Sequence, residues 1–128
     1  MRPGWTEKRL QNAAEKILKT LRVRAASLDI ILLDHQSITR LKARFIKKKT
    51  EPNVLAFPEP PHFPHPETKK RYLGEVYLNK DILGKSPERA MPLLLHGILH
   101  LLGYRHGRKA EIAEMEGLEK KILAKVSR

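Results

Sequence analysis

The sequence contains no cysteine among its 128 residues. Disulfide bridges and zinc sites built from thiolates are therefore excluded, and the composition fits a reducing compartment. No apolar run is long enough to cross a bilayer, and the first residues lack the pattern of a secretory signal peptide. These absences predict a cytoplasmic protein with no membrane-spanning segment.

Acidic residues are also few, with 14 Asp and Glu against 26 Lys and Arg, which gives a formal net charge of +12. A domain this basic usually binds a polyanion, most often a nucleic acid. The basic residues gather in runs at 47–49, 69–71 and 105–109. An anionic membrane surface is a weaker alternative, because no expected helix joins a wide basic face to interfacial aromatic residues.

The most informative segment is residues 96–106, which read H-G-I-L-H-L-L-G-Y-R-H. His96 and His100 share one face of a helix, because an α-helix turns once per 3.6 residues. Gly103 can take the left-handed conformation that ends a helix and turns His106 back towards them. Three neutral imidazoles leave a fourth tetrahedral position open, as in a catalytic zinc site. The segment therefore predicts one zinc ion per chain, held by His96, His100 and His106.

One position separates this segment from the metalloprotease pattern H-E-x-x-H-x-x-G-x-x-H. Gly97 stands where the proteases have a glutamate, and that glutamate is their general base. Glycine cannot take a proton, so the expected substrate is not a peptide bond. The surrounding cations instead favour phosphodiester chemistry, since they attract phosphates and stabilise developing negative charge.

Periodicity and turn residues predict a short series of helices and strands. Thr6 is an expected N-cap, and Ser86 with Pro87 predicts a second helix start. Residues 58–66 form an expected surface loop, in which His62 and His65 are solvated. The predicted elements are helix 6–22, strand 28–33, helix 37–45, strand 53–57, strand 72–78, helix 87–102 and helix 109–126.

So few short strands exclude a barrel or a doubly wound sheet. The prediction is an α+β fold: one domain over residues 1–128, with a small mixed sheet packed against helices. The histidines lie on a zincin-like helix that is apolar on most sides, so it is expected to lie inside the protein.

Three segments, in the same order, resemble the YbeY family of endoribonucleases. Residues 96–106 match the family motif H-G-x-L-H-L-x-G-Y-D-H at every fixed position but one. Residues 53–58 (N-V-L-A-F-P) are similar to its T-[DN]-V-L-S-F-P strand, and residues 73–78 (L-G-E-V-Y-L) to its L-G-D-I-x-I strand. The resemblance covers about residues 28–124.

The resemblance implies a single-domain α+β fold and a zinc-type metal held at the motif positions His96, His100 and His106. It implies metal-dependent cleavage of single-stranded RNA, with roles in maturing ribosomal RNA, especially the small-subunit 3′ end, and in ribosome quality control. The expected partners are single-stranded or ribosomal RNA and the ribosome or its proteins. The expected phosphate contacts are Lys47, Lys48, Lys49, Arg105 and Arg108.

The chain departs from the family pattern at four positions. Arg105 replaces the motif aspartate, which could orient a ligand histidine; arginine has no acceptor but can contact phosphate. Pro52 and Ala56 stand where the family has hydroxyl side chains. Ile46 aligns with a family arginine, whose charge the adjacent lysines 47 and 48 could supply.

The sequence leaves the proton acceptor and the nucleophile open. Glu75 is a candidate general base if its strand edge faces the cleft, and the attacking group is either water or the RNA 2′-hydroxyl. Two other functions also stay open. One is a zinc hydrolase acting on peptides or small molecules. The other is a zinc-stabilised protein that binds RNA or the ribosome without catalysis.

Overall fold

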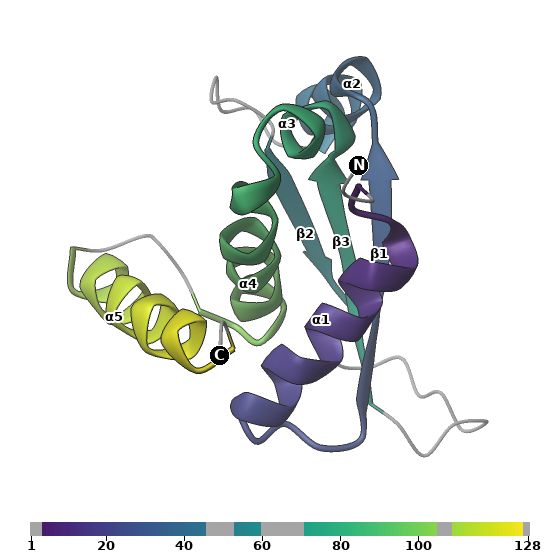
Figure 1. Ribbon diagram of the computed structural model, residues 1–128. Helices are drawn as coiled ribbons and strands as arrows, with labels where there is room; N and C mark the ends of the chain where they lie inside the picture. The colour runs from purple at the N-terminus through teal and green to yellow at the C-terminus, as the bar shows by residue number, and fades with distance from the viewer. Residues whose placement is uncertain (1–3, 46–52, 60–70, 105–108, 127–128) are drawn as a thin grey trace.

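The computed structural model describes residues 4–45, 53–59, 71–104 and 109–126 (Figure 1). The helices and strands run in the following order: α1 (Glu7–Thr20), β1 (Ala26–Leu33), α2 (His35–Phe45), β2 (Val54–Pro58), β3 (Arg71–Asn79), α3 (Lys80–Lys85), the 3₁₀ turn η1 (Pro87–Arg89), α4 (Ala90–Leu101) and α5 (Lys109–Val126). None of the described helices combines the length and apolar character needed to span a bilayer.

The three strands form one mixed sheet in the order β1-β3-β2. Strand β3 lies in the centre, parallel to β1 and antiparallel to β2. Strand β2 is at an edge of the sheet, where its closing Pro58 needs no ladder partner for a backbone N–H. A small mixed sheet packed with helices confirms the predicted α+β fold.

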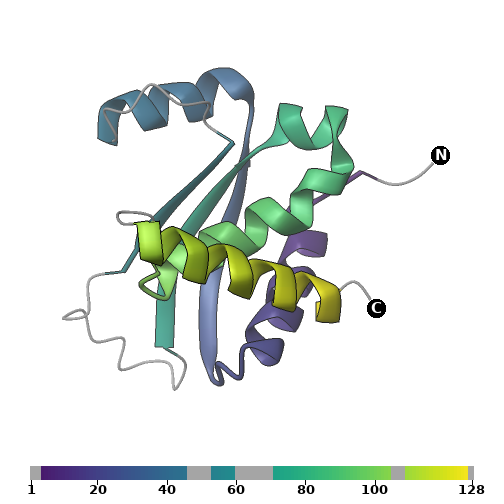
Figure 2. The same cartoon turned by 90° about the vertical axis from the view of Figure 1, so that its left-hand side faces the viewer.

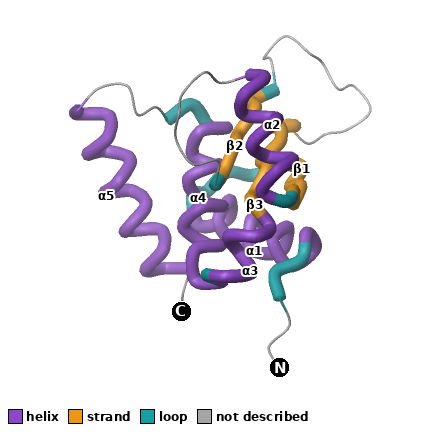
Figure 3. The backbone as a smooth tube through the Cα atoms, turned by 90° about the horizontal axis from the view of Figure 1, so that it is seen from above, coloured by secondary structure: helices purple, strands orange, loops and turns teal. Residues whose placement is uncertain are grey.

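Helices α1 and α4 cover one face of the sheet, and α5 lies outside them, away from the strands (Figures 1–3). Alternation along β3 supplies this core: Val76 and Leu78 are fully buried, together with Leu94 and Ile98 of α4. Each such side chain contributes about 1.5–3 kcal/mol through removal of apolar surface from water. The histidine-bearing helix is therefore an internal, well-anchored element, as its composition predicts.

The opposite face of the sheet is covered in part by α2. Phe45 of this helix contacts Phe57 of β2, and Phe57 contacts Tyr77 of β3, with ring centroids 5.6 and 5.7 Å apart. Ile38 of α2 and Leu55 of β2 are buried on this side, apart from the main core. One face of β3 therefore packs against α4 in the main core, and the other face lies towards α2.

Two close contacts between elements require glycine. A Cβ atom on Gly97 would lie 2.8 Å from Cγ1 of Val76, so the absence of a side chain lets α4 lie directly on β3. Gly74 has a φ of +132°, and a Cβ there would collide with the carbonyl oxygen of Phe57. Gly97 thus lets α4 lie close to the sheet, and Gly74 lets β3 lie close to β2; larger residues at these positions would force the elements apart.

The structure corrects the predicted element boundaries in three places. Helix α3 was not predicted, because its start depends on the Asn79 side chain, which accepts hydrogen bonds from the N–H groups of Asp81 and Ile82. The predicted cap at Ser86 is wrong: Ser86 makes no side-chain cap bond, and a 3₁₀ turn precedes α4. Helix α2 begins at His35 rather than at Ser37, since Oδ1 of Asp34 accepts the Ser37 N–H at 2.7 Å.

The Gly97 contact predicts opposite outcomes for two glycine substitutions in helices. Gly117→Ala in α5 meets no atom within 4 Å, so it should stabilise the fold by about 0.5–1 kcal/mol through helix propensity. Gly97→Ala should be less stable than Gly117→Ala by about 1–3 kcal/mol, because Val76 and β3 must move. Urea unfolding of both variants measures the difference, and equal stabilisation would contradict the packing.

Candidate metal centre

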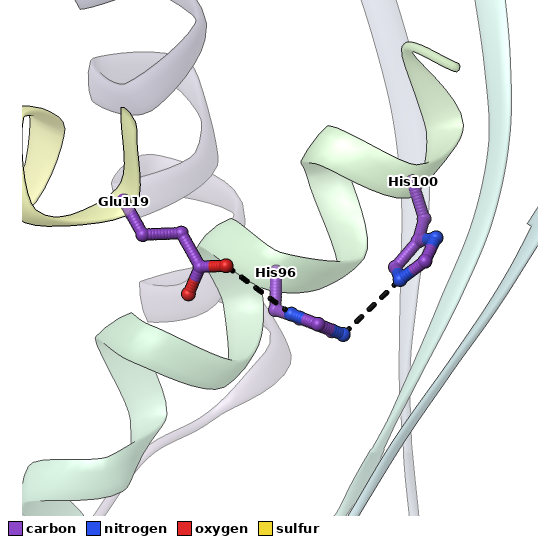
Figure 4. Close-up of polar contacts among 3 residues, drawn as sticks. All are labelled: His96, His100 and Glu119. Atoms are coloured by element: carbon purple, nitrogen blue, oxygen red, sulfur yellow. Dashed lines mark hydrogen bonds and ion pairs between the residues drawn. The ribbon is translucent and has the colours of Figure 1, made fainter. Parts of the chain in front are cut away.

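Helix α4 presents His96 and His100 on the same side, one turn apart (Figure 4). Both are half-buried, and their Nε2 atoms point at each other across 3.1 Å. The rings meet edge to face, with centroids 4.6 Å apart and planes at 70°. The i, i+4 spacing therefore brings two potential ligand atoms together on a packed helix, as predicted.

The separation of the two Nε2 atoms suits ligands that share one ion. Two nitrogens each about 2.0–2.1 Å from a tetrahedral zinc lie about 3.3 Å apart, close to the 3.1 Å found here. If Nε2 of each ring serves as the ligand atom, the ring proton must reside on Nδ1. The pair can thus occupy two of the four positions around a zinc ion.

The sequence did not identify Glu119, which approaches the pair from α5. Its Oε1 lies 3.5 Å from Nδ1 of His96, and the two side chains are only 20% and 28% exposed, respectively (Figure 4). A carboxylate at the outer nitrogen of a ligand histidine holds the ring proton there and fixes the ring's orientation. Glu119 shares a face of α5 with the buried Met115 and Ile122, a signal visible in the sequence. The sequence does not show that this face of α5 packs against α4, so it does not place Glu119 beside His96.

Helix α4 ends as its sequence predicts. Gly103 has a φ of +103°; its N–H donates to His100 O at 3.1 Å, and the Tyr104 N–H donates to Leu99 O at 3.0 Å. These are the two hydrogen bonds of a Schellman motif, which terminates the helix and redirects the chain. The redirection begins three residues beyond His100, as a returning third histidine requires.

Several predicted site residues lie outside the described ranges. They are His106, Arg105, Arg108, the lysines 47, 48 and 49, Ile46, Pro52, His62 and His65. Among the residues that the structure does describe, no group of three histidine, aspartate or glutamate side chains is gathered to hold a metal. The described part of the centre is therefore the pair His96 and His100 with Glu119 beside it.

The structure does not bring Glu75 to the histidines. Its neighbour Val76 lies under Gly97 of α4, and successive side chains of a strand point to opposite faces. Glu75 therefore faces the α2 side of the sheet, where its Oε2 accepts a hydrogen bond from the Tyr77 hydroxyl at 2.9 Å. Glu75 was a candidate general base only if it faced the histidine site, and in the structure it faces the other side of the sheet.

That side of the sheet holds two tyrosine–carboxylate pairs. Burial, followed by the hydrogen bond to Glu75, raises the pKa of Tyr77 to about 12. The pKa of Tyr72 is also raised, first by burial and then by its 2.7 Å hydrogen bond to Oδ2 of Asp29. Both phenols are therefore neutral donors at physiological pH.

Fold and site together define a small α+β protein with a histidine pair on its core helix. The family model for endoribonuclease YbeY matches residues 3–127. The endoribonuclease YbeY of Bartonella henselae is 31% identical, with 97% of this chain and 87% of that protein aligned. The Thermobifida fusca endoribonuclease YbeY is 34% identical over 92% and 84% of the respective chains.

A solved structure is also similar. The solution structure of TM1509 from Thermotoga maritima superposes with a TM-score of 0.52, covering 96% of this chain and 87% of that one at 22% identity. At that identity the likeness supports the fold alone. The family model and the curated relatives establish the affiliation: this chain belongs to the YbeY endoribonuclease family.

The Tyr77–Glu75 pair predicts a change in tyrosine titration. Glu75→Gln should lower the pKa of Tyr77 from about 12 towards 10 but not to it, because the burial remains. Spectrophotometric titration of the phenolate measures this, with Tyr77→Phe identifying the transition that belongs to this residue. A pKa unchanged by Glu75→Gln would contradict the pairing.

The same shift fixes a pH dependence of stability. The folded-state pKa of Tyr77 lies above the ordinary value of 10, so the folded protein keeps a proton that the unfolded chain loses. This contribution to the free energy of unfolding is present below pH 10 and is lost as the pH rises towards 12. Urea unfolding across that range should show a smaller loss for Tyr77→Phe than for the wild type.

Proposed function

We propose that this protein is a zinc-dependent endoribonuclease that cleaves single-stranded RNA. Its place would be in ribosomal RNA processing in the cytoplasm, at the 3′ end of the small-subunit RNA and in ribosome quality control. The observation that carries the proposal is the convergence of two Nε2 atoms on the core helix of a YbeY family member. The ribosome or its proteins would be its partners.

The residues that would hold the zinc ion are His96 and His100 through Nε2, with His106 as the third ligand by motif position. A zinc ion bound by three histidines supplies a Lewis acid and lowers the pKa of a bound water to about 7. The chain's own contribution is rigidity. Buried neighbours on α4 fix the backbone beneath both rings, so little reorganisation accompanies binding.

Glu119 and the cationic residues have separate tasks in this proposal. Glu119, with Oε1 3.5 Å from Nδ1 of His96, would favour the ring proton at Nδ1 and so the use of Nε2 as the ligand atom. Lys47, Lys48, Lys49, Arg105 and Arg108 are the proposed phosphate contacts; they would hold the RNA and stabilise negative charge at the phosphorus centre.

The packing of Gly97 supports a phosphodiester rather than a peptide as substrate. A protease would carry its catalytic glutamate at this position. Here any side chain would meet Val76 and Val54 of the sheet. The close packing of α4 on the sheet therefore leaves no room for a glutamate at position 97. The high positive charge of the chain supports the same choice.

Loss of one histidine of the pair should abolish cleavage. We expect His100→Ala to lose metal-dependent cleavage of an unstructured RNA, because one of the converging ligand atoms is removed. His35→Ala is the matched control, since His35 lies on α2 and pairs with Asn79 instead. Gel analysis with and without a chelator measures the activity.

Two outcomes would contradict the proposal. Undiminished cleavage by His100→Ala would show that the pair has no part in the reaction. Salt-sensitive RNA binding by the wild type without cleavage, whichever divalent metal is supplied, would instead assign a non-catalytic, RNA-binding role.

Removal of the Glu119 carboxylate should weaken zinc binding. We expect Glu119→Ala to raise the zinc dissociation constant about 10–100-fold, the usual effect of losing a carboxylate that orients a ligand histidine. Competition with a chromophoric chelator measures the constant. Glu116→Ala is the control, because it removes an exposed carboxylate from the same helix. Equal affinities of the two variants would leave Glu119 only a packing role.

A further inference from the structure

Helix α1 ends with an arginine in a conformation that usually belongs to glycine. Arg22 has a φ of +61°; its N–H donates to Lys19 O at 3.0 Å, and the Val23 N–H donates to Leu18 O at 2.9 Å. This is the same Schellman motif that ends α4, where the equivalent residue is Gly103. One fold thus ends two helices identically, once with glycine and once with arginine.

The arginine is locally unfavourable. A Cβ atom in the left-handed region approaches the backbone, a strain that glycine avoids. Ala25, three residues later, has a φ of +51°, so the α1–β1 turn contains two such residues. The helix dipole does not require the charge of Arg22, because Lys19 already lies in the last turn. An arginine in a conformation that favours glycine points to a use of its side chain beyond folding.

The turn is surrounded by cations and by a hollow that could receive a ligand. Lys19, Arg22 and Arg24 are exposed and line a hollow of about 540 Å³, whose apolar lining includes Leu18 and Val23. Glu15 is the acidic residue among its described lining residues. This volume lies in the usual range of small-ligand sites, about 300–1,000 Å³.

Strand β3 begins beside this turn with a third exposed arginine, Arg71. The exposed Arg71 donates its N–H to Ala25 O at 2.7 Å, which ties the start of β3 to the turn. The turn also lies at the same end of the molecule as the C-terminal end of α4, close to which His100 stands (Figures 1 and 2). We call Lys19, Arg22, Arg24 and Arg71 the α1–β1 basic surface.

We infer that the α1–β1 basic surface binds the sugar–phosphate backbone of the RNA substrate, outside the histidine site. Arginine's planar fork fits phosphate oxygens through paired, charge-assisted hydrogen bonds, and three of the four residues are arginines. The apolar lining suits a base or ribose between such contacts. An anionic membrane fits less well, because these four residues and the lining of the hollow include no interfacial aromatic side chain.

The inference rests on RNA being the substrate, and it adds a length requirement to the proposed function. An RNA long enough to reach both the histidine pair and this surface gains phosphate contacts that a shorter one lacks. The wild type should therefore bind longer single strands more tightly than shorter ones of the same composition. Removal of the surface cations should reduce that preference.

The test is RNA binding by the full-length double variant Arg22→Gly/Arg24→Gln. Fluorescence anisotropy with a 2′-O-methyl RNA, which keeps every phosphate but withholds the 2′-hydroxyl, is measured between about 50 and 200 mM salt. Two lost contacts should reduce the slope of log K against log salt by about 1.4, at about 0.7 per single-strand phosphate. Arg22→Gly relieves strain, so the melting temperature should stay the same or rise.

The control is Lys8→Gln, which removes a cation from the other end of α1. It should leave the salt slope closer to the wild-type value than the double variant does. Equal slopes for the double variant and the wild type would overturn the inference while leaving the endoribonuclease proposal intact. Wild-type protein that binds no RNA would overturn both. Loss of binding to anionic vesicles, with RNA affinity unchanged, would assign the surface to lipid instead.

Discussion

The direct contact between Gly97 of α4 and Val76 of β3 fixes the rotation of the histidine helix. Each residue turns an α-helix by about 100°, so His96 lies about 100° to one side of Gly97 and His100 about 60° to that same side. Both rings therefore leave the helix along one flank while the glycine presses into the sheet. A side chain at position 97 would move the helix away from β3 and change the setting of the pair. The glycine that appeared to mark a missing catalytic base is thus a structural requirement of the site.

Much of the fold followed from local pattern. Helix 109–126 has the predicted bounds, and the strand closed by Pro58 lies at a sheet edge as proline requires. Helix α3 did not follow, because its cap is a side chain that belongs to the preceding strand. The cap predicted at Ser86 is wrong for a related reason. A serine before a proline predicts a side-chain cap, but here the Ser86 carbonyl accepts the Arg89 N–H in a 3₁₀ turn that precedes α4.

The site residues likewise fall into those that local sequence predicts and those that it does not. The spacing of His96 and His100 is a local property, and the structure confirms that they converge. The positions of Glu75 and Glu119 are not local, since each depends on which neighbour its element packs against. The face of β3 that meets α2 holds Glu75, and the docking of α5 on α4 brings Glu119 to His96. The periodicity of the sequence shows which residues share a face of a helix or strand. Which neighbouring element that face packs against is set by the whole fold.

Helix α5 packs against the histidine helix from the side remote from the sheet, and in the described part of the chain it brings the Glu119 carboxylate to His96. Binding of the proposed ion and docking of this helix would then be linked equilibria. A zinc ion held by the pair would favour the histidine tautomer that donates to Glu119, and so would favour the docked helix. By the same reciprocity, anything that lifts α5 from the body of the protein would lower the affinity for such an ion. If the proposed ion binds, helix α5 would thereby couple the compactness of the fold to the occupancy of the histidine site.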